Sequence, residues 1–170
     1  MLRYTLYEIR RSVLSFSSLF YTIIMPVGLY LLFGALQDYA KIKVADGNAA
    51  AYVMIGIALY GAISCTVSIS GLTVVENVAG WGRQLGLTPM NTGKYLLSKC
   101  CVAFIMAAVP ITAVNIVARM TKIDMPLKQQ IACAALSILC AMVFGFFGLA
   151  IGFLVPSESA VGIANGVLVV

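Results

Sequence analysis

Four long runs without a charged residue constrain this chain more than any other feature of its sequence. They lie between Arg11 and Asp38, between Asp46 and Glu76, between Lys99 and Arg119, and between Lys128 and Glu158. An α-helix needs about 20 mostly apolar residues to cross a hydrocarbon core of about 30 Å. The pattern therefore predicts an all-α, polytopic membrane protein.

Charged residues are confined to the gaps between these runs. Of the 170 residues, 62% are hydrophobic, and only 11 are Lys or Arg and 6 are Asp or Glu. A helix on a soluble domain carries charge along one face, because that face meets water. A signal peptide has one short apolar segment before a soluble sequence, whereas here further apolar runs follow the first. Lipid is therefore the expected solvent for most of the surface.

We expect the charge-free runs to form four complete membrane spans and part of a fifth. The spans are placed at residues 12–36, 49–75, 100–118 and 129–155, with the partial fifth at 159–170. The first span carries Pro26 near its middle, where the missing backbone donor predicts a kink. Glycines four apart in apolar helices predict close helix packing. The pairs are Gly148 with Gly152 and Gly162 with Gly166.

Residues 2–11 precede the first span and predict an amphipathic helix that lies on the membrane. Leu2, Leu6 and Ile9 recur at helical spacing and form a narrow apolar stripe. The charged residues of the segment are Arg3, Glu8, Arg10 and Arg11. The alternative is an ordinary basic N-terminus, because so short a segment is a small sample of periodicity.

The groups needed for catalysis or ion coupling are missing from the sequence. There is no histidine, and no predicted span has a charged residue in its interior, where proton-coupled transporters need one. Gly93-Lys94 precedes Tyr95, where a phosphate-binding loop needs Ser or Thr. Five cysteines without CxxC spacing predict neither a zinc site nor a disulfide framework. We expect no enzymatic activity and no cofactor or metal in this chain.

The net charge of +5 favours a lipid partner rather than nucleic acid. Lys and Arg are scattered over short segments beside the spans, where they anchor helix ends at anionic headgroups. With the N-terminus inside, the cytoplasmic segments hold six basic residues and the outer segments five. That difference says little about orientation, although the first segment usually dominates.

Residues 76–99 form the longest polar connection, and they predict a docking element for a partner. A solvated loop would not need the apolar side chains of Trp81, Leu85 and Met90, whereas a segment that fills a partner's groove would. Trp and Arg are also enriched at binding hot spots. The alternative is that Trp81 belongs to the aromatic belt at the membrane interface.

Several short patterns, taken in order, resemble the permease subunits of type-2 ATP-binding cassette (ABC) exporters of the drug-export kind. The resemblance covers residues 2–170. The patterns are Glu8, Arg10 and Arg11 before the first span, Pro26 followed by Leu31-Leu32-Phe33-Gly34, Glu76 at the end of the second span, Arg83-Gln84-Leu85, Thr88-Pro89, Lys99 at the start of the third span, and Gly148 to Pro156.

The resemblance implies a cytoplasmic N-terminus, an amphipathic elbow helix and six spans in each permease. It also implies that the connection between spans two and three contacts a cytoplasmic ABC ATPase subunit, which binds ATP and Mg²⁺. A second permease, identical or different, would complete the transporter in the plasma membrane, most often that of a prokaryote. The expected ATPase-coupling residues are Glu76, Trp81, Arg83, Leu85, Thr88 and Pro89.

We expect this chain to be a multidrug-type permease subunit with a largely apolar path for a drug or lipid. The family continues through the rest of span five and span six, so a C-terminally truncated frame or a fragment is expected. Two alternatives stay open: a truncated module that only binds or regulates partners, and an ATP-independent channel. The second predicts flux without nucleotide.

Overall fold

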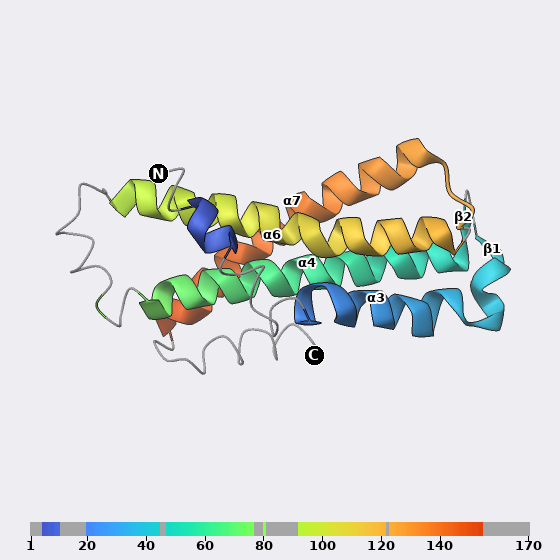
Figure 1. The fold of residues 1–170 in the computed structure, drawn as a ribbon, viewed down its shortest axis with the longest axis horizontal. Coiled ribbons are helices and arrows are strands. Elements are labelled where there is room, and N and C mark those ends of the chain that lie inside the picture. Colours follow the sequence, from blue (N-terminus) through green and yellow to red (C-terminus); the bar gives the residue numbers. More distant parts are fainter. Residues whose placement is uncertain are drawn as a thin grey trace.

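The computed structural model is a bundle of long helices (Figure 1) and describes residues 5–10, 20–44, 47–76, 80, 92–121 and 123–154. Its three longest helices are α4 (Ala49–Glu76), α6 (Thr92–Met120) and α7 (Leu127–Leu154). At a rise of about 1.5 Å per residue, such helices reach about 42 Å, which exceeds the hydrocarbon thickness of about 30 Å. Each contains a candidate membrane span, and a shorter apolar helix covers Phe20–Ala35. The all-α prediction is confirmed.

The helix of residues 20–35 is built from three parts. The π-helical turn η1 (Phe20–Ile24) leads into α3 (Met25–Tyr30), and a second π-helical turn, η2 (Leu31–Ala35), follows. Pro26 stands in the first turn of α3, where its missing N–H leaves a preceding carbonyl without its usual partner. The wider π turn before the proline accommodates this interruption. Residues 12–19, where we predicted this span to begin, lie outside the described residues.

A short polar turn joins this helix to α4. It contains the 3₁₀ helix η3 (Asp38–Lys41) and the two-residue strands β1 (Lys43–Val44) and β2 (Gly47–Asn48), which pair antiparallel. The side chain of Asn48 then begins α4, because its Oδ1 accepts a hydrogen bond from the N–H of Ala51 at 3.2 Å. We refer to this side of the bundle as the hairpin end.

Helix α6 begins before the predicted third span. The run without charge begins at Cys100, whereas α6 begins at Thr92 and continues through Lys94 and Lys99. A charged residue marks the end of a span only where it meets water, and Lys99 is 8% exposed. We refer to residues 77–91, between α4 and α6 in the sequence, as the connection, and to the side of the bundle where α4 ends and α6 begins as the connection end. It also holds the short N-terminal helix of residues 5–10 (Figure 1).

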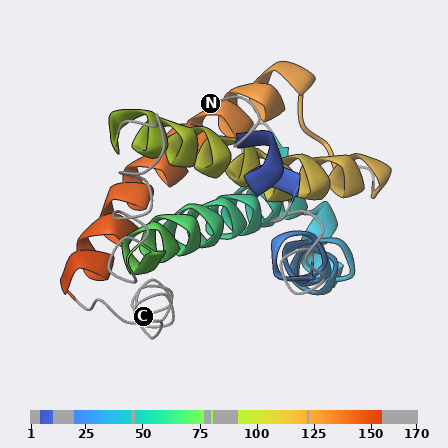
Figure 2. The ribbon, with the colours of Figure 1, turned by 60° about the vertical axis from the view of Figure 1, so that its left-hand side comes forward.

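Helix α4 is the centre of the bundle and packs against α3, α6 and α7. Figure 2 shows α7 crossing one side of α4 and the helix of residues 20–35 on the other. Small residues allow the close approach: a Cβ on Gly61 would lie 3.1 Å from both Pro26 and Pro110. In lipid, where apolar burial gives helices little reason to associate, such close backbone packing supplies the attraction. The buried core around this crossing includes Met54, Ala58, Ala62, Ala107 and Ile111.

The outer face of α7 is apolar and exposed. Leu136, Leu139, Val143 and Phe146 each keep more than half of their surface accessible. Monomeric soluble proteins rarely expose contiguous apolar surface of this kind. The face is suited to contact with lipid chains.

Candidate functional site

Three segments that are distant in sequence meet at a charge cluster at the connection end. Glu8 comes from the N-terminal helix, Glu76 is the last residue of α4, and Lys99 lies in the early turns of α6. Lys99 Nζ donates to Glu8 Oε1 at 2.5 Å and to Glu76 Oε2 at 2.7 Å. The cluster therefore brackets connection 77–91, since Glu76 precedes it and α6 follows it.

Tyr95 completes the cluster from one turn earlier on α6. Its hydroxyl donates to Glu76 Oε2 at 3.2 Å, and its ring centroid lies 5.6 Å from Lys99 Nζ. Residues four apart on a helix share a face, which places the ring beside the ammonium group at the distance of a cation–π contact. Tyr95 is 1% exposed, so its ring also shields one side of the ion pair from solvent.

The electrostatics of the cluster make each member depend on the others. The side chains of Lys99 and Glu8 are 10% and 12% exposed, and that of Glu76 is 28% exposed. Glu76 stands at the C-terminus of α4, where the helix dipole disfavours a carboxylate. One ammonium group thus balances two carboxylates, and the loss of one partner from a buried ion pair leaves an uncompensated charge.

Only part of the predicted coupling region falls among the described residues. Glu76 belongs to the charge cluster, and the other five predicted coupling residues lie outside the described residues: Trp81, Arg83, Leu85, Thr88 and Pro89. Of the residues predicted for the interfacial helix, Glu8 is in the cluster and Arg10 is exposed, while Arg3 and Arg11 lie outside the described part of the chain.

Sequence reasoning did not assign Lys99 and Tyr95 to a site. The charge pattern predicts Lys99 as the boundary of a span, because a charge beside an apolar run normally meets the headgroups. A signal was nonetheless present: two acids and one lysine were all expected on the same side of the membrane. Opposite charges at one membrane face favour pairing, although only the fold shows which of them meet.

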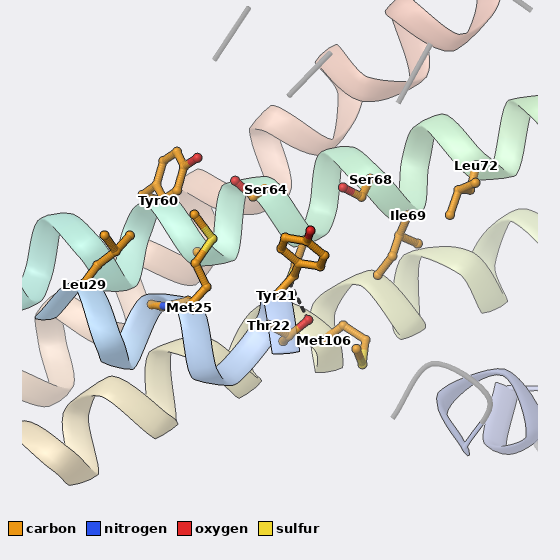
Figure 3. A pocket seen from close by; sticks show the side chains of 13 residues that line it. Tyr21, Thr22, Met25, Leu29, Tyr60, Ser64, Ser68, Ile69, Leu72 and Met106 are labelled. Atoms are coloured by element: carbon orange, nitrogen blue, oxygen red, sulfur yellow. Dashed lines mark hydrogen bonds between the residues drawn. The ribbon is translucent and has the colours of Figure 1, made fainter. Parts of the chain in front are cut away.

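A groove of about 510 Å³ lies between the helix of residues 20–35 and α4 (Figure 3). Its volume is within the range of about 300–1,000 Å³ that is typical of small-molecule sites. Most of its lining is apolar, contributed from both helices and from α6. The apolar side chains include Met25, Leu29, Ile69, Leu72 and Met106.

A few polar groups stand among the apolar walls of the groove. Thr22 from η1 and Cys65 from α4 are in contact, with the thiol donating to Thr22 Oγ1 over 3.6 Å. Ser64 and Ser68 also line the groove from α4, and both are labelled in Figure 3. An apolar pocket with a few hydroxyls can hold an apolar molecule and orient a polar group on it.

At the hairpin end, amides and hydroxyls link the helices. Gln130 of α7 is 5% exposed; its Nε2 donates to Asn115 Oδ1 at 2.7 Å, and its Oε1 accepts from Arg119 Nε at 2.6 Å. The hydroxyls of Tyr30 and Thr121 lie 2.8 Å apart and connect α3 with the end of α6. These bonds join three of the helices at the side opposite the charge cluster.

The predicted packing glycines fall partly within the described structure. A Cβ on Gly148 would lie 2.7 Å from the carbonyl oxygen of Val67, so this glycine faces the backbone of α4. Beside it, Thr66 Oγ1 donates to the carbonyl oxygen of Ala141 at 2.7 Å. Gly152 belongs to α7, but its contacts are outside the described ones, and Gly162 and Gly166 lie outside the described residues.

Long apolar helices, an apolar outer face and polar groups gathered at two opposite ends define an integral membrane protein with several spans. A protein-family model described as "ABC-2 type transporter" matches residues 2–170. The chain belongs to the ABC-2 type transporter family and is a membrane permease, the component that works with ABC ATPase subunits rather than the ATPase itself. Searches of curated proteins and of solved structures gave no match.

Proposed function

We propose that this chain is the permease subunit of an ATP-driven exporter that moves a hydrophobic or amphipathic substrate. The groove between residues 20–35 and α4 carries the proposal, because its volume of about 510 Å³ suits a drug-sized molecule. Its lining offers apolar side chains and hydroxyls. A strongly hydrated ion would lose its water there without gaining charged ligands.

The substrate path would be completed by a second permease, identical or different. Gly148 is used within the chain, because it lies against Val67 of α4, so a permease partner would contact other surfaces. Pairing of the two permeases through faces of small residues is part of this proposal, and the helix-packing role of Gly162 and Gly166 stays a prediction. The cytoplasmic side would be the connection end, which holds the N-terminal helix.

ATP would drive the cycle through a partner ATPase that docks on connection 77–91. Glu76 stands at the start of this connection, and Trp81, Arg83 and Leu85 follow in the sequence. ATP-driven closure of two ATPases would move the connection and reshape the groove. Transport would then need nucleotide, unlike flux through a channel.

Alkylation of Cys65 tests whether the groove binds substrate. In a variant that keeps only this cysteine, an apolar maleimide should react with the thiol, and a bound lipophilic substrate should slow the reaction. The matched control keeps only Cys140, which is exposed on α7. Equal rates at Cys65 with and without every lipophilic substrate that is exported would exclude the groove as their site. Export of strongly polar solutes alone would remove the proposed substrate class.

Co-purification tests the coupling to an ATPase. The chain is solubilised from its native membrane in mild detergent and compared with a variant carrying Arg83→Glu and Leu85→Asp. We expect an ABC ATPase to be retained by the first and lost by the second. Retention by both would place the docking site elsewhere on the chain.

A further inference from the structure

We propose that Lys99 is the shared cation that clamps the N-terminal helix to the ends of α4 and α6, so that this helix moves together with connection 77–91. The clamp itself is an arrangement within this chain. The joint movement rests on the proposed function, because an ATPase on the connection would be what moves it.

The geometry of the clamp is the first step. Lys99 and Glu8 are 91 residues apart in sequence, yet their Nζ and Oε1 atoms are 2.5 Å apart. The same ammonium lies 2.7 Å from Glu76 Oε2. A single side chain therefore connects the N-terminal helix to the two helices that flank the connection.

The exposure of the N-terminal helix is the second step. Leu6 is 70% exposed and Tyr7 is 67% exposed, so these two large side chains contribute little burial within the chain. Glu8 is the residue whose side chain reaches the buried lysine. Among the described contacts, this ion pair is the one that links the helix directly to α6, so its loss should weaken the attachment.

The attachment of the connection is the third step. Glu76 ends α4, and α6 begins at Thr92, so both ends of residues 77–91 join the bundle close to the cluster. A force on the connection would displace Glu76 or the first turns of α6, where Tyr95 and Lys99 lie. Because Lys99 also holds Glu8, the N-terminal helix would follow.

Spin labels can measure whether the helix is clamped. Tyr7→Cys and Leu97→Cys place labels on two exposed positions, one on the N-terminal helix and one on α6. The five native cysteines are replaced by alanine, and the chain, with any ATPase that co-purifies, is placed in lipid nanodiscs. Pulsed electron paramagnetic resonance then gives the distribution of distances between the labels. We expect one narrow distribution.

Two variants remove the clamp from opposite sides, and a third variant serves as the control. Lys99→Met should broaden the distribution and lower the ratio of docked to undocked helix by roughly a hundredfold or more. Glu8→Gln should act in the same direction while the pair between Lys99 and Glu76 remains, so helix packing is retained. Lys94→Met removes an exposed lysine from the same helix and should change nothing.

The remaining outcomes separate the clamp from the proposed function. A narrow distribution in both Lys99→Met and Glu8→Gln would overturn the clamp. With the ATPase bound, the label distance should be the same without nucleotide and with trapped Mg-ATP; a change would overturn joint movement. In Glu8→Gln, ATP hydrolysis should continue while export is lost. If no ATPase co-purifies with the unmodified chain, the proposed function and the joint movement both fail, and the label distances still decide the clamp.

Discussion

The connection end and the hairpin end both carry buried polar groups, but they join the helices by different physics. At the connection end, one ammonium holds two carboxylates from separate segments. At the hairpin end, the bonds run between amides, hydroxyls and one guanidinium. A neutral hydrogen bond adds about 1 kcal/mol and one to a charged group about 1.5–3 kcal/mol, whereas a buried ion pair leaves an uncompensated charge when one partner is lost.

This difference suggests different mechanical roles for the two ends. The ammonium group of lysine has three rotatable donors on a flexible stem, so it tolerates small shifts of its partners. The planar amide of Gln130, bound on two sides, fixes the helices in one arrangement. The connection end is therefore suited to movement as a unit, and the hairpin end is suited to a fixed attachment.

The largest expected effect is at the connection end. Lys99→Met removes the ammonium that Glu8 and the partly exposed Glu76 share, and it should lower the free energy of unfolding by about 3 kcal/mol, the lower end of the range for a broken buried pair. If the cost comes from unbalanced charge, adding Glu8→Gln and Glu76→Gln should recover most of it. Thermal unfolding in detergent compares the two variants. A triple variant no more stable than Lys99→Met would mean that shape, rather than charge balance, governs this end.

A smaller effect is expected from Gln130→Leu at the hairpin end. The change removes the partners of Arg119 Nε and Asn115 Oδ1, and such unsatisfied groups cost about 1–3 kcal/mol. The neighbouring Gln129 is exposed, so Gln129→Leu is a matched control with an expected change below about 0.5 kcal/mol. Equal losses in the two variants would refute a fixed amide junction at this end.

The sequence alone predicted the helices better than the contacts between them. Runs without charge identified α4, α6 and α7, because a span needs a minimum length of apolar residues whatever it packs against. The charge pattern did not predict that α6 extends back to Thr92, since Lys99 lies inside this helix and is buried by pairing. A boundary rule based on charge cannot anticipate a partner that is 91 residues away.

The candidate site was only partly accessible to sequence reasoning for the same reason. Glu8 and Glu76 were singled out, but they were assigned to separate segments. Their common partner depends on how α4, α6 and the N-terminal helix are arranged in space. The groove depends likewise on the π turn η1 before Pro26, which places Thr22 opposite Cys65.

Between the two ends, α7 and α4 are in close steric contact at Gly148, so the packing there depends on side-chain size rather than on polar bonds. A Cβ at Gly148 would meet Val67 backbone atoms at 2.7 and 2.9 Å, so Gly148→Ala should push α7 away from α4. Overpacking costs about 1–3 kcal/mol, and the better helix propensity of alanine offsets up to about 1 kcal/mol of this. In contrast, Gly56→Ala on α4 meets no atom within 4 Å and should be neutral or stabilising. If both variants unfold at the same temperature, the contact of α7 with α4 is looser than the distances indicate.

The smallest effect is expected from removing a single hydrogen bond at the hairpin end. This change tests whether each bond there adds its own small share of stability. Tyr30→Phe removes the hydroxyl that lies 2.8 Å from Thr121 Oγ1 and leaves the buried ring in place. Hydrogen bonds between membrane helices contribute about 0.6 kcal/mol on average, so a loss of that order is expected. Tyr52→Phe, at a half-exposed position on α4, is the control. A loss as large as that of Lys99→Met would show that the hairpin end also fails as a unit, and the contrast between the two ends would then disappear.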